Sequence, residues 1–279
     1  MTADSPAPAM APPSGAPVLR RGLCQLAQPA LATVQHTPRF AFQDAALVQV
    51  REGQLDLVAG TQRLSVHGGS TLLLVDPGTC ADLHKTPGGS TRRFRSVLLM
   101  LDAGLLESFQ RGRMGCVPCA VPPAPFRAMP LDGDLARTFG HAVDGAGAAC
   151  ISDERLHHRL LELLCAVHER GHAFRPAPHH ATTRRLRALL GAAPEQRWTA
   201  AQAGHALAMS EATLRRRLAA EQQRFDVLLA DVRMQHALML LQTTGWSIPR
   251  IALACGYQSR ARFAERFRGR FGYLPSTVR

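Results

Sequence analysis

Long apolar segments are absent from this chain. No apolar run approaches the roughly 18 residues that a membrane-spanning helix needs, so we expect no membrane span. Residues 1–17 are rich in Pro, Ala and Ser and contain no basic residue, so we expect a disordered tail rather than a secretory signal peptide. We therefore expect a cytoplasmic protein whose seven cysteines stay reduced.

Lysine is also nearly absent, and the positive charge is concentrated at one end. Residues 181–279 hold 16 arginines against six acidic residues, a net charge of +10, whereas the other 180 residues hold 17 basic and 15 acidic residues, a net charge of +2. A genome that favours arginine would explain why Lys85 is the only lysine, but not why the arginines are segregated. A basic segment beside a nearly neutral one indicates a nucleic-acid-binding module.

Short runs rich in Val and Leu recur between about residues 18 and 100, with turn-forming Gly and Pro between them. This spacing predicts a small antiparallel β barrel or sandwich rather than βαβ units. The expected strands are residues 46–50, 55–59, 63–66, 71–75 and 94–101.

Helices are expected to follow the strands. Residues 103–110 suit a short helix, and the proline-rich stretch 116–130 is predicted to be irregular. Ser152 caps a longer helix that Gly171 ends. Five apolar residues share one face of that helix, which either packs on its own β domain or forms a homodimer contact: Leu156, Leu160, Leu163, Leu164 and Val167.

Two helix–turn–helix patterns stand in tandem near the C-terminus. The first pairs residues 199–207 with 210–221, and the second pairs 247–254 with 259–271. A helix of about eighteen residues (225–242), roughly 27 Å long, is expected to connect them. Because successive major grooves on one face of DNA lie about 34 Å apart, such a rigid pair suits a transcription factor that bends its DNA.

The second helix of each unit has one apolar face and one open face. Leu214 and Leu218 in the first unit, and Phe263, Phe267 and Phe271 in the second, repeat at helical spacing and are expected to lie in the core. The open faces carry Ala212, Arg215, Arg216 and Ala219 in the first unit and Arg260, Ala261, Ala264, Glu265 and Arg268 in the second.

The C-terminal segment resembles the DNA-binding domain of the AraC/XylS family of bacterial transcription regulators. The resemblance covers about 90 residues and rests on the motifs Ala206-Leu207, Met209-Ser210, Leu214-Arg-Arg-Arg-Leu218, Arg233-x-x-x-Ala237-x-x-Leu240-Leu241, Ser247-Ile-x-x-Ile251-Ala252-x-x-x-Gly256-Tyr257 and Phe263-x-x-x-Phe267-Arg268-x-x-Phe271-Gly272-x-x-Pro275-Ser276.

By this resemblance the DNA bases are read by residues on the same open faces. The implied base-contacting residues are Ala212, Arg215, Arg216, Arg260, Ala261, Ala264 and Glu265. Phosphate contacts are expected from Thr199, Ser210, Arg217, Ser259, Arg262 and Arg268. Two positions depart from the family: Ala212 offers only a methyl group, and Glu265 stands where a basic or polar residue is common. We expect Glu265 either to pair with Arg262 or Arg268 or to read a cytosine.

The β-rich N-terminal region resembles the cupin-like sensor domain of the same family. The matching pattern is Val-x-Val-x-x-Gly-x-Leu-x-Leu from Val48 to Leu57, followed by Gly69 and Leu72 to Leu74. The resemblance implies that this domain binds a small effector, dimerises, or does both. A metal-dependent cupin enzyme needs a close histidine pair with a carboxylate, whereas His36, His67 and His84 are scattered, so we expect no metal, no other cofactor and no catalysis.

Two alternatives to an effector-controlled regulator concern cysteine. Cys116 and Cys119 form a single CxxC pair, which would serve a redox or metal sensor, although zinc requires four ligands. A DNA-tethered enzyme such as a DNA-repair alkyl acceptor would need a four-cysteine zinc site and a Pro-Cys-His-Arg motif, and neither occurs.

The sequence thus predicts an α+β protein in four segments. These are a tail (1–17), a cupin-like antiparallel β domain with helices (18–170), a linker (171–181) and an all-α domain of two helix–turn–helix units joined by a long helix (182–279). The expected partners are double-stranded promoter DNA, RNA polymerase and an effector whose identity the sequence leaves open.

Overall fold

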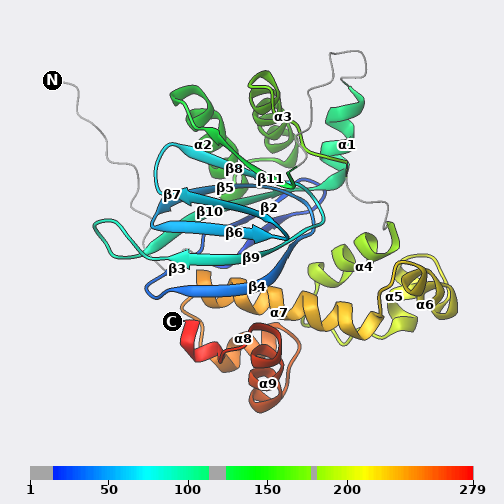
Figure 1. Cartoon of the computed structure of the whole chain (residues 1–279). Helices are drawn as coiled ribbons and strands as arrows, with labels where there is room; N and C mark the ends of the chain where they lie inside the picture. The colour runs from blue at the N-terminus through cyan, green and yellow to red at the C-terminus, as the bar shows by residue number, and fades with distance from the viewer. Residues whose placement is uncertain (1–14, 113–123, 177–180, 279) are drawn as a thin grey trace.

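The computed structural model describes residues 15–112, 124–176 and 181–278. Two antiparallel sheets with three helices form the N-terminal region, and the C-terminal residues that are described form a group of helices (Figure 1). This arrangement confirms the predicted α+β class. Cys116 and Cys119 lie outside the described residues.

The larger sheet has the strand order β1-β2-β10-β5-β8-β11, and β3 also pairs with β10. Its central strands are covered on both faces, so nearly every side chain in them is buried. The strands are β1 (Val18–Arg20), β2 (Cys24–Ala27), β3 (Ala30–Leu31), β5 (Ala45–Glu52), β8 (Thr71–Val75), β10 (Phe94–Leu101) and β11 (Phe126–Pro130).

The smaller sheet packs against one face of the larger sheet and has the order β4-β9-β6-β7. Its strands are β4 (Gln35–Phe42), β9 (Thr79–Thr86), β6 (Gln54–Ala59) and β7 (Gln62–His67). The pairing of β4 with β9 is interrupted between Thr37 and Phe40. The chain passes from β5 of the larger sheet to β6 of the smaller sheet at Gly53, where φ is +83° and a Cβ atom would lie 2.4 Å from the carbonyl oxygen of Thr86, so only glycine fits.

The five predicted strands correspond to β5, β6, β7, β8 and β10. The prediction of an irregular stretch over 116–130 is wrong at its end, because Phe126–Pro130 forms β11 and pairs with β8 at the edge of the larger sheet. Pro130 is tolerated there because it closes an edge strand.

Three helices flank the N-terminal sheets: α1 (Ala103–Arg111), α2 (Gly133–Gly147) and α3 (Asp153–Glu169). The Ser152 hydroxyl caps α3 by accepting from the Arg155 N–H, as predicted. The apolar face of α3 is at most 2% exposed and belongs to the same core as α2 and the larger sheet. The alternative of a dimer contact through this face is therefore wrong, since its leucines are already covered within the chain.

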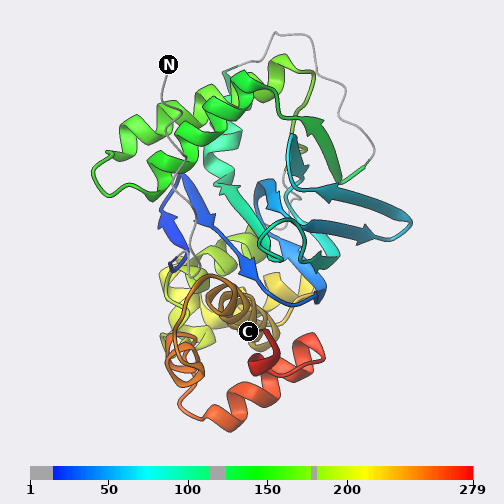
Figure 2. The ribbon, with the colours of Figure 1, turned by 90° about the vertical axis from the view of Figure 1, so that its left-hand side faces the viewer.

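The helical region lies on the opposite side of the sheets from α2 and α3, as the side view shows (Figure 2). Among the described residues, no helix is both long and apolar enough to cross a membrane. The elements are α4 (Ala181–Ala192), α5 (Ala200–Ala206), α6 (Glu211–Ala220), α7 (Phe225–Thr243), α8 (Ile248–Ala254), α9 (Arg260–Phe271) and the 3₁₀ helix η1 (Pro275–Val278).

The two helix–turn–helix units have different cores. The core of the first unit is a small separate cluster in which Leu214 of α6 packs with Leu186 of α4 and Leu228 of α7. The second unit shares one continuous core with the C-terminal half of α7 and with the space between the two sheets. The second unit is therefore built onto the β-rich region, whereas the first packs on α4 and the N-terminal half of α7.

Candidate nucleic-acid interface

The first unit consists of α5 and α6, and local sequence sets both ends of each helix. Thr199 and Gln202 form a reciprocal capping box in front of α5. The turn is tight, because Ala208 has a φ of +58° and a Cβ atom on Gly204 would lie 2.9 Å from the Met209 carbonyl oxygen. The Ser210 hydroxyl then caps α6 by accepting from the backbone N–H of Thr213.

The open face of α6 is as predicted. Leu214 and Leu218 are buried, while Ala212, Arg215 and Arg216 are exposed. The Arg215 side chain forms an ion pair within the helix, since its Nη2 lies 2.8 Å from Oε1 of Glu211 one turn earlier. Within the described residues the Arg216 side chain has no such ion pair, and neither has that of the exposed Arg217. The guanidinium most available to a ligand on this face is therefore that of Arg216.

The second unit repeats the plan with α8 and α9. The hydroxyls of Ser247 and Ser259 cap the two helices, and Gly272 ends α9 in a left-handed conformation. The phenylalanine stripe of α9 is buried as predicted. Tyr257 and Tyr273 pack edge-on against Phe263 and Phe267, which completes an aromatic cluster.

The open face of α9 carries positively charged arginines and one negatively charged glutamate. Arg260, Ala261 and Glu265 are exposed, as are the flanking arginines 262 and 268, and Ala264 is half-buried. The expected pairing of Glu265 with Arg262 or Arg268 is wrong for the described structure, in which Glu265 takes part in no ion pair. The arginines around this face outweigh its one carboxylate, so the face remains positive.

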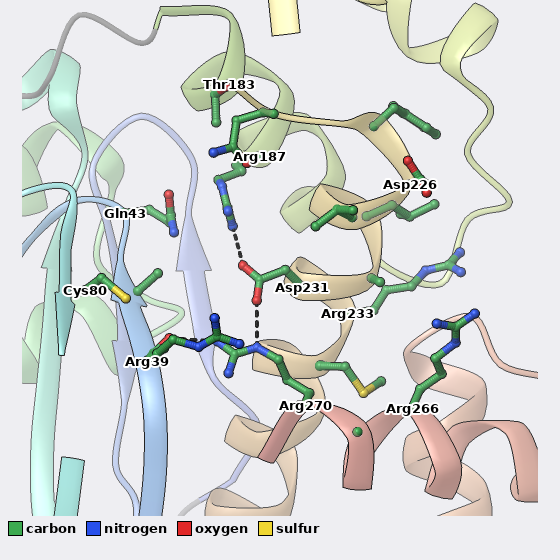
Figure 3. A pocket seen from close by; sticks show the side chains of 18 of the residues that line it. Arg39, Gln43, Cys80, Thr183, Arg187, Asp226, Asp231, Arg233, Arg266 and Arg270 are labelled. Atoms are coloured by element: carbon green, nitrogen blue, oxygen red, sulfur yellow. Dashed lines mark hydrogen bonds and ion pairs between the residues drawn. The ribbon is translucent and has the colours of Figure 1, made fainter. Parts of the chain in front are cut away.

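Helix α7 joins the two units through a salt-bridge centre that the motifs did not reveal (Figure 3). The Asp231 carboxylate accepts from Arg187 Nη1 of α4 at 2.8 Å and from Arg270 Nε of α9 at 2.9 Å. All three side chains are mostly buried, which raises the cost of leaving any one of them unpaired. A lone aspartate in the middle of a long helix was the available signal, but its partners lie about 40 residues away on either side.

Arg233 makes a second bridge between the units. Its guanidinium donates to the carbonyl oxygens of Pro194 and Gln196 at 3.0 and 2.8 Å and lies over the Tyr257 ring. A Cβ atom on Gly256 would lie 2.6 Å from Arg233 Nη2, so glycine at the turn makes room for this contact. These contacts tie the segment before α5 and the turn between α8 and α9 to the connecting helix α7.

The β-rich region meets α7 through buried polar groups. Lys85 on β9 donates from Nζ to Gln242 Oε1 at 2.8 Å, and Gln242 Nε2 donates to Gln35 Oε1 on β4. The Lys85 and Gln242 residues are only 7% and 2% exposed. Burial lowers the pKa of Lys85 from 10.5 to about 7, and the group that accepts from it is an uncharged amide.

The histidines of the β-rich region are less scattered than predicted. His36 and His84 stack across β4 and β9 with ring centroids 4.1 Å apart. Asp56 on β6 is the cross-strand neighbour of His84 on β9, but its Oδ1 accepts hydrogen bonds from Ser65 and Gln54. Within the described ranges, no group of three His, Cys, Asp or Glu residues is arranged to hold a metal ion.

Two capped reading helices fixed on one connecting helix define a double helix–turn–helix module. Residues 203–279 match a family model described as a helix-turn-helix domain. The HTH-type transcriptional regulator GadX of Escherichia coli K12 is 39% identical over 79 residues, which are 28% of this chain and 29% of GadX. YdeO of the same strain is 36% identical over 94 residues, which are 34% of this chain and 37% of YdeO.

The C-terminal region is therefore an AraC-type helix–turn–helix domain, as its motifs predicted. The chain spans about a third of the length of these curated relatives.

Structures of ToxT from Vibrio cholerae share the fold of nearly the whole chain. An apo form of a ToxT variant matches with a TM-score of 0.62 and 13% identity over 91% of this chain and 96% of that one. Wild-type ToxT with a bound unsaturated fatty acid matches with a TM-score of 0.59 and 14% identity over 93% and 96%. The order of an N-terminal antiparallel β domain and a helical C-terminal domain is thus that of ToxT.

Proposed function

We propose that the protein is a sequence-specific DNA-binding transcription regulator. The observation that supports this best is the fixed pair of reading helices, α6 and α9, whose open faces carry unpaired arginines. The α7 helix of 19 residues is about 28 Å long. Since this is less than the distance of about 34 Å between successive major grooves, DNA bends toward the protein when both helices are engaged.

Base contacts are assigned to the two open faces. Arg216 presents its guanidinium to O6 and N7 of a guanine, and Glu265, which has no ion-pair partner in the described structure, accepts from the N4 amino group of a cytosine. The remaining base contacts come from Ala212, Arg215, Arg260, Ala261 and Ala264. Phosphates of the DNA are bound by Thr199, Ser210, Arg217, Ser259, Arg262 and Arg268. The first, second and fourth of these stand at helix N-termini, which direct N–H groups at the DNA backbone, and the arginines contribute positive charge.

The proposal has three further parts. A small effector bound in the N-terminal region controls the protein, the protein contacts RNA polymerase, and it acts in the cytoplasm without catalysis. The fatty acid bound to ToxT supports effector binding in a protein of this fold. The division of the chain at residues 171–181 likewise stays a prediction.

The test is binding-site selection from random duplexes with the full chain, followed by mobility-shift titration at two salt concentrations. We expect a recurrent site with two halves and an affinity that falls steeply with salt, because arginine–phosphate contacts release counterions. Arg63→Ala is the control for Arg216→Ala, because it removes an exposed arginine from β7 of the smaller sheet, away from the reading helices. It should retain the affinity of wild type. Binding without sequence preference, or binding that salt does not weaken, contradicts the proposal.

A further inference from the structure

Arg270 stands in the last turn of α9, the second reading helix, and connects this helix with two other parts of the protein (Figure 3). Its Nε donates to Asp231 Oδ1 on α7 at 2.9 Å. Its Nη1 and Nη2 donate to the carbonyl oxygens of Pro38 and Arg39 on β4 at 2.9 and 2.7 Å. The side chain is only 15% exposed. One guanidinium group therefore uses all three of its nitrogens to hold α9 against the connecting helix and the β-rich region.

A bulge in β4 presents the two carbonyl oxygens. Between two regular pairs of β4 and β9, Pro38 and Arg39 stand opposite Asp82 alone. Arg39 has a φ of +47°, a conformation that is costly for a residue with a Cβ atom, and its N–H donates to Asp82 Oδ1 at 2.7 Å. Two residues opposite one partner cannot both keep regular ladder bonds, and here the carbonyl oxygens of both accept from Arg270. The strained bulge is thus a receptor for one side chain of the reading helix.

Asp231 extends the connection to the first helix–turn–helix unit. Besides Arg270, its carboxylate accepts from Arg187 Nη1 on α4 at 2.8 Å. The residue before Arg187 is Leu186, which is buried in the core of the first unit together with Leu214 of α6. Contacts therefore run without interruption from the core under α6, through α4 and Asp231, to the C-terminal end of α9.

The place of Arg270 on α9 separates holding from reading. The residues proposed to contact bases lie between 260 and 265, at the N-terminal end of α9, which is the end that a recognition helix directs at the base edges. Helix α9 has 12 residues and is about 18 Å long. Because Arg270 is held from two directions at the other end, its bonds limit how far the reading end can tilt or shift.

We propose that Arg270 is a positioning residue that makes the protein selective for the spacing between the two half-sites of its DNA, and that the β4 bulge is part of this arrangement. One additional base pair turns the second half-site by about 35° and moves it by about 3.4 Å. An α9 held by Asp231 and two carbonyl oxygens resists that displacement, whereas an α9 without these bonds follows it more easily. This inference rests on the proposed function, which it extends to the spacing of the site.

The experiment is a binding-site selection with the full chain, followed by mobility-shift titration on the selected site and on sites with one base pair more or less between the halves. Wild type should bind the selected spacing about tenfold more tightly than the altered ones. In Arg270→Gln this ratio should fall to about threefold, because glutamine cannot supply the three donors. A loss of folded protein alone would weaken binding to all spacings equally, so the ratio distinguishes positioning from stability.

Asp82→Ala tests the same arrangement from the β-rich region, since it removes the acceptor of the Arg39 N–H and leaves α9 unaltered. It should also lower the spacing ratio, and the double variant should be no less selective than Arg270→Gln, because both changes act through one contact. Gln242→Leu is the matched control. It breaks the buried contact between Lys85 on β9 and α7, and it should keep the wild-type ratio although it destabilises the protein.

A folded Arg270→Gln with the wild-type ratio would overturn the inference, and so would an equal loss of selectivity in Gln242→Leu, which would indicate a general loosening of the two regions. If Arg270→Gln does not fold, Asp82→Ala decides, since an unchanged ratio in that variant contradicts a role for the bulge. Failure of the proposed function looks different: wild type then selects no recurrent site with two halves. A wild type with a strict spacing that Arg270→Gln retains refutes only the positioning role.

Discussion

Replacing Lys85 with Met should stabilise the protein near neutral pH. The side chain of Lys85 on β9 is buried against α7, where it makes one hydrogen bond, to Gln242. Methionine has a similar length and carries no charge, so the change removes the cost of burying an ammonium group while keeping the volume. It also leaves Gln242 Oε1 without its donor.

The magnitude follows from the pKa of Lys85, which burial lowers from 10.5 to about 7. At 1.36 kcal/mol per pKa unit, this lowering corresponds to about 5 kcal/mol of destabilisation when the side chain is charged in both states. In Lys85→Met the unpaired Gln242 acceptor costs about 1–3 kcal/mol, which offsets part of the stabilisation. We therefore expect Lys85→Met to raise the free energy of unfolding by about 2–4 kcal/mol at pH 6.

The lowered pKa of Lys85 also predicts how the stability of the wild-type protein changes with pH. A lysine whose pKa is lower in the folded state binds fewer protons there than in the unfolded chain, so stability rises with pH. The destabilisation is complete below pH 7 and disappears as the pH rises from about 7 to 10.5. Urea unfolding of wild type and Lys85→Met at several pH values between 6 and 10 measures this. The advantage of the variant should shrink steadily across that range.

Gln242→Leu is the companion variant, because it leaves Lys85 buried without its acceptor and should destabilise the protein. The other groups that titrate in this range are common to all three proteins and cancel in the differences. If Lys85→Met is less stable than wild type at pH 6, or if the two stability curves run parallel, the side chain is not buried as an isolated cation and the reasoning is refuted.

Four further predictions concern the helical region. Arg216→Ala should cost about 1–3 kcal/mol of DNA-binding free energy and relax the preference at one guanine in a binding-site selection; equal weakening on all sequences would make Arg216 a phosphate contact. Glu265→Ala should keep or improve affinity in mobility shifts and lose preference at one cytosine, and an unchanged preference would contradict direct reading. Phe267→Ala should cost about 3–5 kcal/mol by urea unfolding, since the ring is fully buried, and a normally stable variant would show that the wrong face was assigned to the core. A fragment of residues 182–279 should bind DNA, but calorimetry should show its second unit melting at a lower temperature than in the full chain, where the core is shared; identical melting would contradict that dependence.

The sequence predicted the features that depend on neighbouring residues. The serine and threonine caps and the buried Leu and Phe stripes of α6 and α9 are decided within one or two turns of helix, and all are found. Strands with uniform Val and Leu, such as β5 and β10, were equally recognisable. In β9, by contrast, Lys85 and polar side chains mask the alternation of buried and exposed positions.

Features that depend on distant contacts were not predictable. Helix α2 contains several glycines and is stabilised by packing against α3 and the larger sheet, so its local propensity is weak. The partners of Asp231 lie on helices before and after α7, and nothing local distinguishes this aspartate from a solvated one. The bond from Arg270 on α9 to the carbonyl oxygen of Arg39 on β4 depends in the same way on how the two regions meet.

The unequal cores of the two helix–turn–helix units determine which segments of this protein can be exchanged. The cluster around Leu214 in the first unit involves only α4 and the N-terminal half of α7 besides the unit itself, so a homologous unit in a chimera would have to match two helices and no sheet. The second unit shares its core with α7 and the sheets, and a transplanted α8–α9 pair would have to match those surfaces as well. Recombination between relatives should therefore retain the second unit with its β domain, while the first half of the recognition module varies more freely.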